Sequence, residues 1–335
     1  MRGVALLLTA AALLLGSAAG QARLAPAGVS DAAILDEGFP KSLDEYGFFA
    51  DAPRQLPASG VVPYELKTPL FSDGADKLRF LYLPTGAVAE TQGEGLLRFP
   101  VGSAIVKTFA FGMGDERRLI ETRVLLHRAE GWVALPYRWN EEQTEARLAL
   151  AGARVEVTTP AGETISYRVP NKNQCKACHS VDGEVLPIGP KARNLSEDWL
   201  TALHNRGIVD AVPAGAGTMP DWGESDDTPA LARAYLDVNC AHCHRPGGGA
   251  SNSGLDLTWE QDDPFALGVA KPPVAAGRGA GGLLVSIEPG EPDKSILVHR
   301  MNSAEPGVAM PELGRATIDV EAVRVMREWI AGLQG

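Results

Sequence analysis

The chain has 335 residues, of which 45% are hydrophobic and 22% charged, and its formal net charge at pH 7 is −11. This length predicts two or three domains. The acidic balance excludes the basic face with which proteins bind nucleic acid, and it favours partners that present a basic docking surface.

The first 20 residues have the pattern of a secretory signal peptide. Arg2 precedes an apolar run over 4–15, which gives way to small residues over 16–20. The run is too short to cross a bilayer as a helix. We therefore predict cleavage of 1–20, export to the periplasm and no membrane span in the mature chain, since no other stretch is long and apolar enough.

Residues 21–57 mix alanine, proline and acidic residues without sustained periodicity, so we expect a leader with at most one short helix. Over 58–170, short runs of β-branched and aromatic residues alternate with turn residues. Strands are predicted at 78–83, 96–101, 104–111, 118–127, 132–139, 154–159 and 165–169. Such a series predicts an antiparallel β-sandwich or jelly-roll-like domain.

This β-domain offers few residues for chemistry. One predicted strand carries apolar residues at its odd positions, with Lys107 as the exception. His127 stands alone at a strand end, where a histidine is usually a surface or hydrogen-bonded residue. Trp132, Tyr137 and Trp139 either fill the core or line a ligand groove.

All four cysteines lie in two CxxCH motifs, Cys175-Lys176-Ala177-Cys178-His179 and Cys240-Ala241-His242-Cys243-His244. Two thiols three residues apart can add to the two vinyl groups of one porphyrin, and the next histidine then reaches the iron as proximal ligand. The motifs therefore predict two covalently bound haem c groups.

Three alternatives are a zinc site, a thioredoxin-like redox pair and plain disulfides. Zinc ribbons usually separate their CxxC halves by about 15 to 20 residues, whereas the stretch between these two motifs is about three times longer. The spacing therefore favours haem.

The first motif lies in a short module, 171–227. Its one predicted helix runs over 196–207, with Ser196 as N-cap. The sixth ligand of this iron is open: we choose Met219, because thioethers are common distal ligands, and His204 competes with it. With no protein ligand, the iron would bind peroxide or another small molecule.

The second motif lies in a fuller setting, 228–335. Thr228 and Pro229 predict the N-cap and first position of a helix that leads into the motif. Thr317 or Asp319 then caps a C-terminal helix. This order of elements predicts a mainly α, cytochrome-like domain.

The loop between these helices supplies further candidates. Met310, which precedes a proline, is the predicted sixth ligand of the second iron, and Met301 is the reserve. Arg278 and Arg300 are candidate partners of the haem propionates. The GxGxxG pattern over 277–282 does not follow a strand, so it does not predict a dinucleotide site.

The stretch 235–247, together with Met310-Pro311 and the helix ending Glu328-Trp329-Ile330, resembles bacterial class I cytochrome c domains. The layout from Pro63 onward is similar to a family of exported dihaem c-type cytochromes with an N-terminal β-domain. Segments that carry this resemblance include 68–73, 120–123, 173–175 and 187–193.

The motifs and the resemblance together predict a periplasmic dihaem cytochrome that passes single electrons between redox partner proteins. One alternative is a dihaem peroxidase or haem-dependent oxidase with catalysis at the first haem. Another is a β-domain that binds a polymer or a partner, with the cytochrome as its electron outlet. The sequence does not indicate an oligomeric state.

Overall fold

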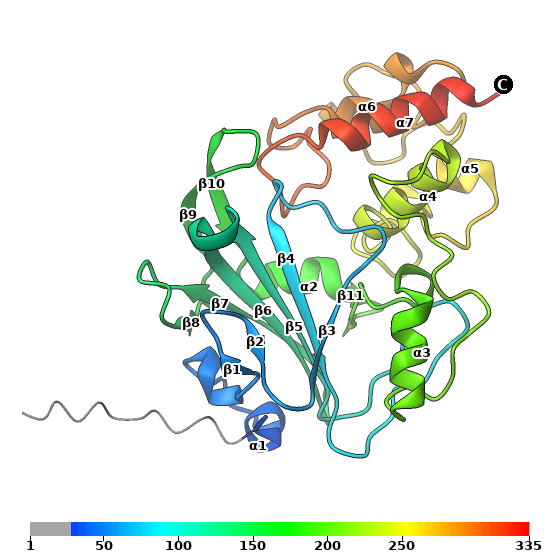
Figure 1. Cartoon of the computed structure of the whole chain (residues 1–335). Coiled ribbons are helices and arrows are strands. Elements are labelled where there is room, and N and C mark those ends of the chain that lie inside the picture. Colours follow the sequence, from blue (N-terminus) through cyan, green and yellow to red (C-terminus); the bar gives the residue numbers. More distant parts are fainter. Residues whose placement is uncertain (1–27, 335) are drawn as a thin grey trace, which may run out of the picture.

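The computed structural model describes residues 28–334, so the predicted signal peptide lies outside the described residues. An antiparallel sheet occupies the first half of the chain, and most of the helices belong to the second half and lie above and to the right of the sheet in Figure 1. Within the part of the chain that the structure describes, no helix has the length and apolar character needed to cross a bilayer.

Six strands form the central sheet, and each one pairs with the next along the chain. They are β3 (Val61–Tyr64), β4 (Asp76–Tyr82), β5 (Ala104–Phe111), β6 (Arg118–Arg128), β7 (Gly131–Trp139) and β8 (Ala146–Leu148). All pairs are antiparallel, as expected for strands joined by short turns. The predicted strands at 78–83, 104–111, 118–127 and 132–139 are confirmed.

A separate hairpin, β9 (Ala153–Thr158) with β10 (Thr164–Val169), confirms two more predicted strands. Its inner side chains, including Tyr167, pack against Phe109 and Phe111 at one end of the sheet. The strand predicted at 96–101 is wrong, because this stretch makes only isolated bridges. Pro100 has no N–H to donate, which interrupts any longer ladder there.

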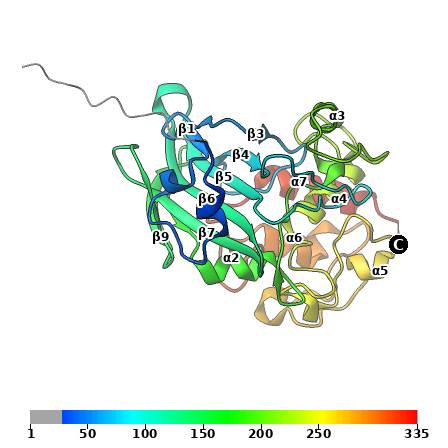
Figure 2. The ribbon, with the colours of Figure 1, turned by 90° about the horizontal axis from the view of Figure 1, so that it is seen from below.

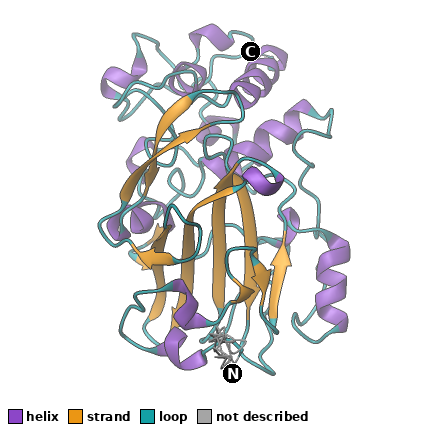
Figure 3. Cartoon of the chain, turned by 60° about the vertical axis from the view of Figure 1, so that its left-hand side comes forward, coloured by secondary structure: helices purple, strands orange, loops and turns teal. Residues whose placement is uncertain are grey.

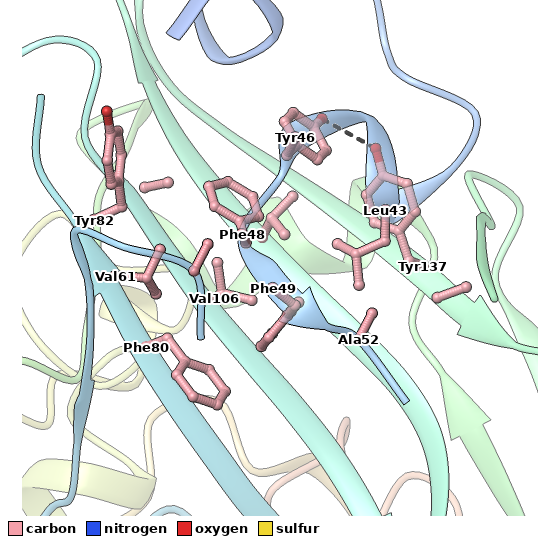
Figure 4. Close-up of a cluster of buried hydrophobic side chains, with 14 of the residues drawn as sticks. Leu43, Tyr46, Phe48, Phe49, Ala52, Val61, Phe80, Tyr82, Val106 and Tyr137 are labelled. Carbon is pink, nitrogen blue, oxygen red and sulfur yellow. Dashed lines mark hydrogen bonds between the residues drawn. The ribbon is translucent and has the colours of Figure 1, made fainter. Parts of the chain in front are cut away.

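Residues 28–57, which we expected to form a leader, cover one face of the sheet. They form α1 (Asp31–Leu35), η1 (Leu43–Tyr46), β1 (Phe49–Asp51) and β2 (Leu56–Pro57). Figure 4 shows Tyr46, Phe48 and Phe49 against Phe80 and Val106, with the hydroxyls of Tyr46 and Tyr137 3.0 Å apart. The strands of this segment are only the short pair β1 and β2, so aromatic side chains rather than a second large sheet cover this face, and the described residues do not form the expected sandwich.

Apart from two short strands, the chain after β10 consists of helices and long loops. Figure 3 shows the helices in purple and the strands in orange. The α-helices are α2 (Lys172–His179), α3 (Glu197–Asn205), α4 (Thr228–Asn239), α5 (Pro264–Leu267), α6 (Ile296–Met301) and α7 (Val320–Gly332). The short strands β11 (Ser180–Val181) and β12 (Glu184–Val185) pair with each other. Single 3-10 turns are η2 (Gly114–Glu116), η3 (Ala192–Asn194), η4 (Ser251–Ser253), η5 (Gly277–Ala280) and η6 (Pro292–Lys294).

Side-chain caps fix where these helices begin. Ser196 accepts a hydrogen bond from the backbone N–H of Trp199 at 3.4 Å, which confirms the predicted start of α3. The cap of α4 is Asp227 rather than the predicted Thr228, which instead occupies the first helical position. Asp319 caps α7 by accepting from the N–H of Ala322 at 3.0 Å.

The apolar faces of α4 and α7 form a shared core. Leu231 and Tyr235 of α4 and Met326 and Ile330 of α7 are buried in one cluster. The helix α2 lies against β7, as the view from below shows (Figure 2). The two helical regions thus hold the two CxxCH motifs near the free face of the sheet.

Candidate cofactor site

The two CxxCH motifs, which are far apart in the sequence, lie side by side. The first forms most of α2, and the second follows α4 directly, with Cys240 as its C-cap. The thiol of Cys243 lies 3.9 Å from the carbonyl oxygen of Ala177. One ligand atom from each of Cys178, His242 and Cys243 lies within 4.8 Å of the others.

A first cavity opens between the free face of the sheet and the loops around the second motif. It contains Cys175, Cys178 and His179 from the first motif. Its floor is the sheet, through residues such as Ile105 and Leu125. The volume of this cavity is about 160 Å³.

A second cavity lies among α4, α6 and the loops between them. It contains Cys240, Cys243 and His244 from the second motif, together with Met310. Its volume is about 530 Å³. This falls within the roughly 300–1,000 Å³ that ligand and cofactor sites usually occupy.

The two cavities are neighbours with a common wall. Four residues line both of them: Cys178, His242, Pro311 and Leu313. Groups bound in the two cavities would therefore be separated by little more than these side chains.

The ring of His179 is held in one tautomer. Its Nδ1 lies 2.8 Å from the carbonyl oxygen of Leu186, and a carbonyl can only accept, so Nδ1 carries the proton. Burial lowers the pKa of His179 to about 4, so the ring is neutral at pH 7. Nε2 therefore keeps a free lone pair, which is the state that a metal ligand requires.

His244 is held in the same way by a different partner. Its Nδ1 lies 2.9 Å from the hydroxyl oxygen of Ser253, and that hydroxyl donates its own proton to the carbonyl of Ala250 at 2.7 Å. The hydroxyl can then only accept from His244, so Nδ1 again carries the proton. Burial lowers the pKa of His244 to about 4, which leaves this ring neutral as well.

The four thiols differ in reactivity. Burial raises the pKa of Cys175 to about 11 and that of Cys240 to about 12. In contrast, the neighbouring thiol of Cys243 and the nearby ring of His242 hold the pKa of Cys178 below its ordinary value. A lower pKa favours the thiolate, which is the reactive form of a cysteine.

The sulfur donors predicted as sixth ligands are placed differently. Met310 lines the second cavity together with His244, and so does Met301, which is also part of the core between α4 and α7. Met219 is 1% exposed, packs against Ala234 and Val238, and is absent from the lining of the first cavity.

The first cavity contains nitrogen donors that sequence reasoning missed. His204 lies on the exposed side of α3, away from this cavity, and its Nδ1 is 3.2 Å from the carbonyl of Val209. His242 lines the cavity, and its buried Nδ1 has no hydrogen-bond partner. Lys107 lines the cavity too. Two signals could have found them: Lys107 breaks an apolar alternation, and His242 is an extra imidazole inside a CxxCH motif.

The two arginines predicted to contact haem propionates differ in their position relative to the second cavity. Arg300 lines the second cavity, where its Nε donates to the carbonyl of Val308 at 2.9 Å. Arg278 does not line that cavity; it lies at the surface and pairs with Glu305 at 3.0 Å. The structure therefore brings one of the two arginines to the second motif.

Comparisons with protein-family models, with curated proteins and with solved structures gave no match to this chain. The arguments about function below therefore rest on the residues and their geometry.

Proposed function

We propose that this protein is a periplasmic c-type cytochrome, with one haem attached at each CxxCH motif, that transfers single electrons between partner proteins. The observation that carries the proposal is the content of the two adjacent cavities. Each contains the two thiols and the histidine of one motif, and each histidine is neutral with its Nδ1 proton engaged. The haem, when bound, supplies an iron that takes up and releases one electron.

The residues present fit such a group. Thiols for two thioether links and an imidazole nitrogen for the iron lie together at the edge of each cavity. Apolar side chains such as Ile105 and Leu125 in the first cavity, and Leu255 and Leu257 in the second, suit the faces of a porphyrin. The second cavity, at about 530 Å³, has a volume usual for cofactor sites, whereas the first, at about 160 Å³, is smaller, so a porphyrin bound there would require the surrounding loops to move apart.

Each cavity also contains a second side chain that could complete six-coordinate iron. Met310 is the sulfur donor that shares the second cavity with His244, which supports a His/Met site of relatively high potential. His242 is the imidazole that shares the first cavity with His179. A second protein donor at both sites favours an electron carrier over a peroxidase, which needs an open position.

The common wall supports transfer between the two sites. Because Cys178, His242, Pro311 and Leu313 line both cavities, an electron that enters at one site has a short path to the other. The two haems would thus exchange electrons with each other within one chain rather than act as two independent electron carriers.

Haem counting tests the proposal. The full chain, expressed with export and haem attachment, should carry two haems by absorbance and intact mass. Cys175→Ala/Cys178→Ala and Cys240→Ala/Cys243→Ala should each carry one. A chain that carries no covalent haem, or an alanine pair that keeps both, would overturn the proposal.

One observation favours a second candidate, a site for a soft metal ion. Cys178, His242 and Cys243 offer two sulfurs and one nitrogen within 4.8 Å, a donor set typical of zinc or copper. The two candidates exclude each other, because thiols converted to thioethers no longer provide thiolates. Metal analysis of the purified chain distinguishes them: about one zinc or copper per chain, with no haem, would favour the ion site.

A further inference from the structure

The free face of the central sheet is divided into rows by the register of its strands. Leu81, Ile105, Leu125 and Ala134 are direct partners on β4 to β7 and form an apolar row. Three of them, Ile105, Leu125 and Ala134, line the first cavity. The floor of the cavity therefore has an apolar strip across the strands.

A second row, two residues further along each strand, is cationic. Arg79 pairs with Lys107, and Lys107 pairs with Arg123, on β4, β5 and β6. Residues two apart on a strand share a face, so this row lies beside the apolar strip. All three side chains line the first cavity.

The protein itself leaves this row largely unneutralised. Arg123 donates from its Nε to Glu121 at 2.9 Å, and Glu121 also accepts from the hydroxyl of Tyr167 at 2.7 Å. Arg79 is 7% exposed, its Nε has no hydrogen-bond partner, and neither it nor Lys107 forms an ion pair with a carboxylate among residues 28–334.

Like charges placed directly opposite each other on a sheet are destabilising, and burial away from water adds to the cost. Burial, together with the neighbouring arginines, lowers the pKa of Lys107 well below its ordinary value. Arg168 and Arg315 line the same cavity, and no aspartate or glutamate does among the described residues. A bound anionic ligand would therefore neutralise cationic side chains that the described residues leave without a carboxylate partner.

We propose that the row formed by Arg79, Lys107 and Arg123 is a carboxylate-binding strip for the ligand of the first cavity. The ligand class is a flat apolar body with acidic groups at one edge, which the adjacent apolar and cationic rows match. This inference rests on the proposed function, under which the acidic groups are the propionates of the first haem. Arg79 and Lys107 are its free members, because Glu121 already engages Arg123.

The test measures the reduction potential of each haem in the full two-haem chain. Spectroelectrochemical titration resolves two components, and the one that is lost in Cys175→Ala/Cys178→Ala belongs to the first motif. The variants are Arg79→Gln and Lys107→Gln. Arg54→Gln is the matched control, since it removes the same charge from a side chain that is 78% exposed on the covered side of the sheet.

We expect both variants to lower the first potential by more than the control does, because removal of a cation disfavours uptake of an electron. The second potential should move less, and Lys107→Arg, which restores the charge, should return the first potential toward that of the wild type. Because Arg79 and Lys107 are tested separately, either result stands if the other variant fails to fold.

Two other outcomes are decisive in different ways. A wild-type chain with no haem at the first motif would overturn the proposed function, and this inference with it. A haem-loaded chain whose first potential moves no further in either variant than in Arg54→Gln would overturn this inference alone.

Discussion

The Nδ1 atom of His244 lies 2.9 Å from the Oγ atom of Ser253, and the serine proton is already given to the carbonyl of Ala250. The imidazole is therefore the donor, and it gains electron density from the partner that accepts its proton. Ser253 thus tunes a candidate iron ligand without touching the metal.

We expect Ser253→Ala to raise the potential of the second haem, because a less basic imidazole stabilises oxidised iron less. A threefold to tenfold shift of the equilibrium corresponds to roughly 30–60 mV for one electron. Ser251→Ala is the control, since Ser251 belongs to the same turn, η4, and makes no hydrogen bond to His244. Equal potentials in the two variants would contradict the role of Ser253.

Under the proposed function, the sixth ligand of a haem at the second motif can be tested with two methionines that line the same cavity. Met310→Ala should convert the second haem from low-spin to high-spin and lower its potential, because a thioether ligand raises the potential. Met301→Ala should leave the spectrum unchanged and destabilise the fold by about 2–5 kcal/mol, as for other buried methionines. The reverse pattern would assign the ligand to Met301.

For a haem at the first motif, three variants distinguish the candidate sixth ligands His242, Met219 and His204. His242→Ala should change the spin state of the first haem, as seen by electron paramagnetic resonance. Met219→Ala should leave that spectrum intact but lower stability by about 2–5 kcal/mol, since Met219 is buried in the core. His204→Ala should change neither property. A spin-state change in Met219→Ala or His204→Ala alone would instead assign the sixth ligand to that residue, as predicted from the sequence.

A buried ion network ties α4 to the segment that carries η3. Asp237, which is fully buried, accepts from Nζ of Lys191 at 2.6 Å, from Nη2 of Arg193 at 3.3 Å and from the N–H of Trp259 at 3.1 Å. Asp237→Asn leaves Lys191 without its carboxylate partner and leaves Arg193 with Glu260 alone, so we expect a loss of about 3–5 kcal/mol at pH 7. Chemical denaturation measures it, with the exposed Asp226→Asn as control.

The same carboxyl predicts an acid dependence. Burial would raise the pKa of Asp237, but Lys191 and Arg193 together lower it by more, so it lies below its ordinary value. Its stabilisation is therefore fully present above the unfolded pKa of about 4, and it is lost as the pH falls through the folded value. The stability gap between wild type and Asp237→Asn should narrow below about pH 4; a constant gap would contradict this assignment.

Local patterns in the sequence predicted the local structure well. The alternation over 104–111 and 154–159 gave strands at those positions, and Ser196 and Asp319 began the helices that they were expected to cap. Strand alternation and helix capping depend on residues that are close together in the chain, so both can be predicted from a short stretch of sequence.

Relations between distant segments were harder to predict. Nothing local indicates that residues 28–57 cover a sheet face, or that the two CxxCH motifs, which were read as separate modules, meet across a common wall. Met219 shows the same limit: a methionine beside a proline in a loop resembles a ligand, but the packing around it places it in the core. Which donor faces which cavity depends on the tertiary fold.

The common wall also bears on how the protein would be assembled. Cys175 is 7% exposed in the folded chain, and Cys178 and Cys243 face each other across the junction of the two motifs. Of the four thiols, Cys175 is the one that the sheet and α2 enclose, whereas Cys178, Cys240 and Cys243 stay partly exposed. Under the proposed function, an enzyme that delivers a porphyrin would therefore have to reach Cys175 before the sheet and α2 close together, which sets an order between attachment at the first motif and folding.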